Sequence, residues 1–147
     1  MENFRYLCSL MGRLLSIDYG RRRTGIAVTD PLRIIASGLT TVPTHTLSSF
    51  LKDYFAREAV DIVVVGHPTD MHGNDSESMK YIRPAVERLK REFPAVTFVY
   101  YDERFTSVLA HRAMIDGGMK KSDRRVKGTV DEISATILLN DYLESIK

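Results

Sequence analysis

The sequence has very few of the residues that build covalent or cysteine-based sites. One of its 147 residues is cysteine and none is tryptophan. A single cysteine, Cys8, cannot close an internal disulfide, and it excludes the CxxC motifs of zinc and redox sites. Such sparse cysteine fits a reducing compartment, so we expect a cytoplasmic protein.

Long apolar runs and an excess of one charge are also missing. No run approaches the ~20 residues that cross a bilayer, and we expect no membrane association. The first ten residues lack the apolar core and cleavage site of a signal peptide. The 21 Lys and Arg residues nearly balance 19 Asp and Glu residues, which leaves a net charge of +2. This balance excludes a strongly basic, histone-like protein and does not by itself indicate nucleic-acid binding.

The composition that remains is that of one folded domain. Hydrophobic residues make up 44% of the chain and charged residues 27%, which is ordinary for a globular protein of this length. No repeat, low-complexity segment or linker divides it. A strand-like run begins just after Met11, so we expect a single domain over residues 11–147. Residues 1–10 are then predicted to be a dispensable N-terminal extension.

Short apolar runs predict five strands in a mixed sheet. The first three are joined by short connections, which favours an antiparallel meander. The last two are rich in β-branched residues and alternate with helical segments, as parallel strands do. The expected strands cover residues 14–19, 24–29, 34–42, 62–65 and 96–101.

Apolar residues spaced three and four apart predict helices that flank this sheet. Pro84 lies inside the second helix and should kink it. Thr129 and Glu132 have the spacing of a capping box, so the last helix is predicted to start at Thr129. The basic segment 119–128 is expected to be an exposed loop before it. The helices are expected over residues 47–55, 79–89 and 106–114, and from 129 toward the C-terminus.

Carboxylates in places that favour apolar residues point to metal-assisted phosphodiester hydrolysis, which needs several acids converging on one point. Asp18 lies within the first strand, on the face of Leu14 and Ser16. The alternative is that Asp18 only begins the turn at Gly20. Glu103 follows the strand ending at residue 101, where α/β sheets place ligands. Its alternative is a solvated acid that favours the positive end of the next helix.

Asp131 is the most informative of the three acids. An acid in the first turn of a helix is stabilised by the helix dipole, which is the simple explanation for it. Asp131 also shares a face with Ser134, Ala135 and Leu138, and two small residues there indicate close approach to the sheet. An acid on a packed face needs a charge partner or a metal ion.

Four segments, in order along the chain, resemble motifs of the YqgF/RuvX family. Residues 18–27 match its D-x-G-x-x-R-x-G-x-A opening. Residues 66–73 resemble its G-L-P…M-D-G loop, with His67 and His72 as departures from it. Residues 102–107 match D-E-R-x-T-[ST], and residues 127–131 match K-x-x-V-D. The resemblance extends over nearly the whole chain from residue 11.

This resemblance implies a ribonuclease H-like fold, as in RuvC-type nucleases, and a role in processing the 5′ end of pre-16S ribosomal RNA. It implies that Asp18, Glu103 and Asp131 are the catalytic, metal-binding acids. The metal would be Mg²⁺, with Mn²⁺ as a substitute. It also implies that three basic residues lie near substrate phosphate, namely Arg23, Arg104 and Lys127.

The resulting hypothesis is a Mg²⁺-dependent nuclease that acts on structured RNA, either pre-16S rRNA or a pre-ribosome. One alternative is a Holliday junction resolvase acting on branched DNA, which would need a dimer with two sites. Another is a nucleic-acid or ribosome-binding module with little catalysis. We expect a monomer or a weak homodimer. His67 and His72 have no cysteine cluster near them, so a zinc site is not expected.

Overall fold

The computed structural model describes residues 12–69, 72–102 and 127–147. Three predicted segments therefore lie wholly or largely outside the described residues. These are the N-terminal extension, the helix at 106–114 and most of the basic segment 119–128, of which only residues 127 and 128 are described, as part of a helix.

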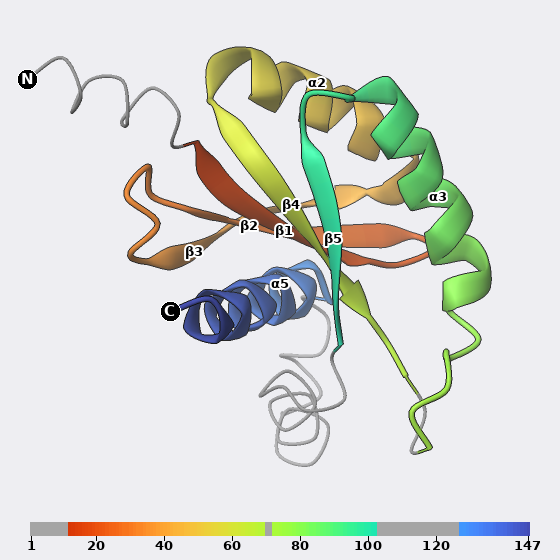
Figure 1. Ribbon diagram of the computed structural model, residues 1–147. Coiled ribbons are helices and arrows are strands. Elements are labelled where there is room, and N and C mark those ends of the chain that lie inside the picture. Colours follow the sequence, from red (N-terminus) through yellow and green to blue (C-terminus); the bar gives the residue numbers. More distant parts are fainter. Residues whose placement is uncertain (1–11, 70–71, 103–126) are drawn as a thin grey trace, which may run out of the picture.

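One mixed sheet of five strands forms the centre of the molecule (Figure 1). The strand order is β3-β2-β1-β4-β5. β1 pairs antiparallel with β2, and β2 with β3, whereas β1–β4 and β4–β5 are parallel. The predicted meander and two parallel strands are thereby confirmed. The strands are β1 (Arg13–Tyr19), β2 (Arg23–Thr29), β3 (Ala36–Pro43), β4 (Val60–His67) and β5 (Thr97–Asp102).

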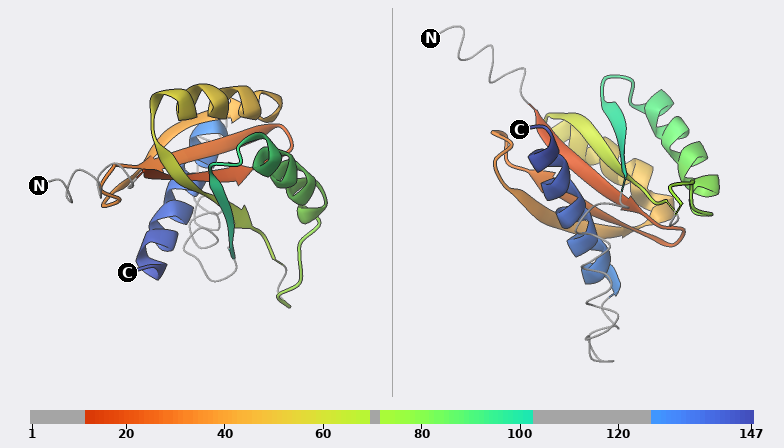
Figure 2. Two further views of the ribbon diagram at one scale, coloured as in Figure 1. Left: turned by 45° about the horizontal axis from the view of Figure 1, so that its top comes forward. Right: turned by 60° about the horizontal axis from the view of Figure 1, so that its bottom comes forward.

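Helices cover both faces of the sheet (Figure 2). α2 (Leu47–Arg57), preceded by the short 3-10 helix η1 (Thr44–Thr46), and α3 (Met79–Glu92) lie on one face. α5 (Lys127–Ser145) crosses the other face. None of the helices in the described ranges is long and apolar enough to cross a membrane.

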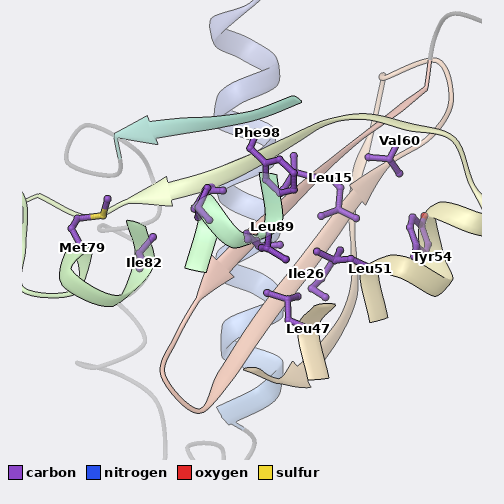
Figure 3. Packing of buried hydrophobic residues seen from close by; sticks show 14 residues of the cluster. Leu15, Ile26, Leu47, Leu51, Tyr54, Val60, Met79, Ile82, Leu89 and Phe98 are labelled. Atoms are coloured by element: carbon purple, nitrogen blue, oxygen red, sulfur yellow. The ribbon is translucent and has the colours of Figure 1, made fainter. Parts of the chain in front are cut away.

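Alternation along β1 divides the interior into two cores. Leu15 and Ile17 join the apolar cluster under α2 and α3 (Figure 3). Leu14 faces the opposite way and packs with α5. Ser16 is on the same face as Leu14, and its hydroxyl donates a hydrogen bond to the carbonyl of Ala135 in α5 at 2.6 Å. Period-two alternation therefore places Asp18, the next residue on this face, on the side of α5.

The structure corrects the start of two elements. β3 begins at Ala36 rather than residue 34, because the Asp30 carboxylate accepts hydrogen bonds from the backbone N–H groups of Ile34 and Ile35. α5 already begins at Lys127, so Thr129 lies inside the helix and the predicted capping box is wrong. α3 continues through Pro84, whose side chain is exposed.

Candidate functional site

The site begins at the carboxyl end of β1. Asp18 is the penultimate residue of this strand and lies opposite Gly25 of β2 in the antiparallel register. β4 runs parallel to β1, so both strands end at the same edge of the sheet. This edge is where open α/β sheets bind their ligands.

Gly25 brings α5 against this edge. A Cβ atom at Gly25 would lie 2.1 Å from the backbone oxygen of Asp131, a distance that no real side chain occupies. The absence of a side chain therefore lets the backbone of α5 touch β2 directly. Ser134 and Ala135 are buried as the small residues of the same helix face. The close approach predicted from these small residues is confirmed.

Asp18 and Asp131 line one pocket, which we call the carboxylate pocket, with a volume of about 290 Å³. Its lining residues come from five elements and from residues directly beside them, namely β1, β2, β4, α3 and α5. The structure thus brings together two acids that are 113 positions apart in the sequence. The pocket is lined by Asp18, Tyr19, Gly20, Arg23, Gly66, Pro68, Ser78, Tyr81, Ile82 and Asp131.

Asp131 has a charge partner within this pocket. The Nε of Arg23 donates to Oδ2 of Asp131 at 2.9 Å, and 24% of the Asp131 side chain is exposed. Asp131 is the fifth residue of α5, and the first turn of the helix contains no acid. Stabilisation by the first turn of the helix is therefore not the reason for an acid here. The guanidinium group of Arg23 instead balances the negative charge of Asp131 on this packed face.

The remaining predicted site residues lie outside the described part of the chain. This holds for Glu103, for Arg104 and for the side chain of Lys127. β5 ends at Asp102, which lies beside His67 of β4 in the parallel register and accepts a hydrogen bond from the Thr69 hydroxyl at 3.1 Å.

Asp30 is a further acid next to a strand, but it lies away from the carboxylate pocket. It follows Thr29, the last residue of β2, whereas Arg23 at the start of that strand lines the carboxylate pocket. Its carboxylate is engaged by backbone N–H groups of the β2–β3 turn. Asp30 therefore belongs to the turn and is not an acid of the pocket.

His67 has a structural partner. Its Nε2 lies 2.7 Å from Oδ1 of Asp75, and the ring meets that of Tyr100 edge-on. Arg83 of α3 donates to the other oxygen of Asp75. Both hydrogen bonds lower the pKa of the Asp75 carboxyl below its usual value, and the one from Arg83 has the larger effect. The network ties the segment after β4, which includes Pro68 of the carboxylate pocket, to α3.

Sequence reasoning missed the contribution of α3 to the pocket. Tyr81 lines it, and its ring lies 6.1 Å from that of Tyr19 and beneath the guanidinium of Arg21 at 4.9 Å. The sequence pattern gave no signal for this position, because it depends on how α3 packs against the end of β1. Burial raises the pKa of the Tyr19 hydroxyl, and the positive charge of Arg88 opposes this shift.

The residues in the pocket fit a divalent cation. Carboxylate oxygens are the ligands that Mg²⁺ and Mn²⁺ prefer, and Asp18 and Asp131 supply them from two elements. The hydrogen bond from Arg23 is made to Oδ2 of Asp131, and Oδ1 of the same carboxylate can serve as a metal ligand. Within the described ranges no three His, Cys, Asp or Glu side chains gather as a metal site, and Glu103 is outside those ranges.

Comparisons with known proteins identify the family of the chain. The family model described as "RuvX: Holliday junction resolvase" matches residues 12–145. A Phocaeicola vulgatus protein named "Putative pre-16S rRNA nuclease" is 57% identical over 137 residues, covering 93% of this chain and 99% of the relative. A Bacteroides thetaiotaomicron protein of the same name is 57% identical over 135 residues, covering 92% of this chain and 98% of the relative.

A solved structure shows the fold. T. thermophilus RuvC in complex with a Holliday junction substrate superimposes with a TM-score of 0.58 at 18% identity, covering 92% of this chain and 95% of that chain. The ribonuclease H-like fold expected from the sequence is thereby confirmed. With a family model that matches nearly its whole length and relatives of more than half identical sequence, the chain belongs to the RuvX family.

Proposed function

We propose that this protein is a metal-dependent nuclease that hydrolyses phosphodiester bonds during 5′-end processing of pre-16S rRNA. One observation carries the proposal: Asp18 and Asp131 line a single pocket, with the Arg23 guanidinium beside them. The names of the relatives from P. vulgatus and B. thetaiotaomicron support pre-16S rRNA as the substrate.

Asp18 and Asp131 would hold the cation, and Glu103 is proposed as the third ligand. We propose Mg²⁺, with Mn²⁺ able to replace it, because both accept carboxylate ligands. When bound, such an ion supplies an activated water and positive charge on the leaving oxygen. Without a cation, two carboxylates in one pocket would repel a phosphate group, which disfavours a module that only binds nucleic acid.

Arg23 would orient the scissile phosphate. A guanidinium offers several N–H donors in a fixed plane, and the Nε of Arg23 is the donor to Asp131. The terminal nitrogens of the same group would then donate to phosphate oxygens above the carboxylates. Arg104 and Lys127 are proposed to bind the neighbouring phosphates, since contacts of this kind position a backbone without reading its sequence.

RNA within a pre-ribosome is the proposed partner, and sparse cysteine fits a reaction in the cytoplasm. The family description names a Holliday junction resolvase instead. That activity would require a dimer, because a four-way junction is two-fold symmetric and needs two sites. We expect a monomer or a weak homodimer, and we treat junction cleavage as an outcome of the test.

The test compares two substrates under three metal conditions. Purified protein is incubated with a pre-16S RNA fragment containing the 5′ leader and with a synthetic four-way DNA junction, each with Mg²⁺, Mn²⁺ or chelator. Asp18→Asn should lose at least about 100-fold in cleavage rate, because a metal ligand is removed. Asp53→Asn, on the exposed face of α2, is the matched control and should cleave at the wild-type rate.

The result expected is RNA cleavage that needs the metal and is lost in Asp18→Asn. Cleavage that continues in the chelator, or that is equal in Asp18→Asn, contradicts the mechanism. Selective cutting of the junction contradicts the RNA substrate and supports the resolvase.

A further inference from the structure

A second hollow of about 510 Å³ adjoins the carboxylate pocket. It lies between the β1–β2 turn, the start of α2 and one side of α3. Its apolar lining includes side chains that are at most 5% exposed, namely Leu47, Ala85 and Leu89; Leu47 and Leu89 are labelled in Figure 3. Its basic lining consists of Arg21, His45 and Arg88. We call this hollow the arginine groove.

The arginine groove continues the carboxylate pocket along α3. Ser78, Tyr81 and Ile82 line the pocket, while Ala85, Arg88 and Leu89 line the groove. These positions recur at intervals of three and four residues, so they follow one face of the helix. From Tyr81 to Arg88 this face extends about 10 Å along the helix axis.

Two side chains join the hollows directly. Tyr19 lines both of them. The guanidinium of Arg21, in the groove, lies 4.9 Å above the ring of Tyr81, in the pocket. Arg88 is near enough to Tyr19 for its charge to act on the pKa of the Tyr19 hydroxyl. The aromatic pair Tyr19 and Tyr81 therefore lies where the carboxylate pocket meets the arginine groove.

The groove has an excess of positive charge. Arg21 and Arg88 are exposed, and neither forms an ion pair within the part of the chain that the structure describes. One acid also lines the groove, Glu92, whose carboxylate accepts the Ser48 hydroxyl at 2.5 and 2.6 Å. A groove with an apolar floor and with arginines whose charge no described acid neutralises suits single-stranded nucleic acid, which presents both phosphates and flat bases.

We propose that the arginine groove binds the single-stranded stretch of the substrate next to the scissile phosphate. Arg21 and Arg88 contact its phosphates, and the strand reaches the carboxylates across Tyr19 and Tyr81. This inference rests on the proposed function, since it assigns a neighbouring part of the same substrate. It also gives a role to Arg21, which lies in the turn just before β2 and lines the groove beside the pocket of acids.

The test uses charge changes of opposite sign in the groove. Binding of a labelled single-stranded RNA of about twelve nucleotides is measured by fluorescence anisotropy in chelator, across a range of salt. Arg88→Gln should raise Kd about three- to fivefold and make the salt dependence shallower, because one phosphate contact is lost. Glu92→Gln should lower Kd by a similar factor. Arg91→Gln, an exposed arginine of α3 that does not line the groove, is the matched control.

Single-stranded DNA of the same length should show the same changes, because phosphate contacts do not distinguish the two polymers. In the cleavage assay Arg88→Gln should raise KM and leave kcat near the wild-type value. A Kd for Arg88→Gln equal to that of wild type, or equal to that of Arg91→Gln, would overturn the inference. Loss of metal-dependent cleavage in Asp18→Asn is read separately, so failure of the groove and failure of the proposed nuclease give different results.

Discussion

At the scale of single residues, the contact between Gly25 and Asp131 decides how the two acids meet. A methyl group at Gly25 would lie 2.1 Å from the Asp131 carbonyl oxygen and 2.3 Å from its carbonyl carbon, which are both backbone atoms. Backbone within a helix cannot rotate aside as a side chain can. Any atom added here must push α5 away from β2, and Asp131 moves with the helix.

Gly25→Ala should therefore lower the free energy of unfolding by about 1–3 kcal/mol, as overpacking of a closely packed contact does. It should also weaken binding of Mg²⁺, because Asp131 shifts from Asp18. Urea unfolding measures the first effect and calorimetric titration the second. Gly38→Ala is the control, because the nearest atoms to its Cβ belong to the flexible Glu132 side chain rather than to backbone. A loss of stability for Gly38→Ala as large as that for Gly25→Ala would contradict the argument.

The site residues that the sequence could predict are those marked by patterns among neighbouring residues in the chain. Asp18 stands out within a strand, and Asp131 stands out beside small residues on a helix, so local patterns singled out both as candidates. The ion pair between Arg23 and Asp131 spans 108 positions, and local patterns do not report such contacts. The pocket position of Tyr81 depends on how α3 packs against β1, which is likewise a tertiary property.

At the scale of elements, the turn between β2 and β3 shows why the strand boundary was wrong. The sequence pattern continues β3 back to Ile34, but Ile34 and Ile35 are 65% and 64% exposed. The Asp30 carboxylate accepts the backbone N–H groups of Leu32, Ile34 and Ile35. The Asp30 side chain thus accepts backbone N–H groups that would otherwise bond to the neighbouring strand. A pattern of apolar residues does not reveal this competition.

These hydrogen bonds predict a pH dependence of stability. Those from Ile35, Ile34 and Leu32 lower the pKa of the Asp30 carboxyl below its usual value of 3.8, against a smaller opposing effect of desolvation. The stabilisation is present above pH 3.8, where the carboxyl is ionised in both states. It is lost as the pH falls below 3.8 and through the lower pKa of the folded protein.

The comparison variant is Asp30→Asn, which cannot titrate and loses one of the two acceptor oxygens. Urea midpoints measured from pH 7 down to pH 2 should show wild type more stable at neutral pH, with a gap that closes below pH 3.8. Asp75, whose pKa is also lowered, is present in both proteins and cancels in the comparison. A gap that stays constant down to pH 2 would contradict a role for the ionised carboxyl.

At the scale of the whole molecule, elements from both faces of the sheet build the site. The larger apolar cluster lies under α2 and α3, whereas α5 on the other face brings Asp131 to the end of β1. The α/β architecture and the strand order follow from short connections and alternating helices, so the sequence predicts them. The position of α5 on the sheet depends on contacts of Gly25, Ser16 and Ala135. These contacts join residues far apart in the sequence, so only the structure reveals them.

Because the carboxylate pocket exists only when α5 is seated on the sheet, binding of a divalent cation should stabilise the whole fold. A ligand that binds only the folded state adds about 1.4 kcal/mol at ten times its Kd. For a chain of this length that corresponds to a rise in Tm of about 3–6 °C. The measurement is thermal unfolding by circular dichroism with Mg²⁺ or with chelator, at matched ionic strength. Asp18→Asn should lose most of the rise, whereas Asp53→Asn should keep it. An equal rise in Asp18→Asn would place the stabilising cation elsewhere on the protein.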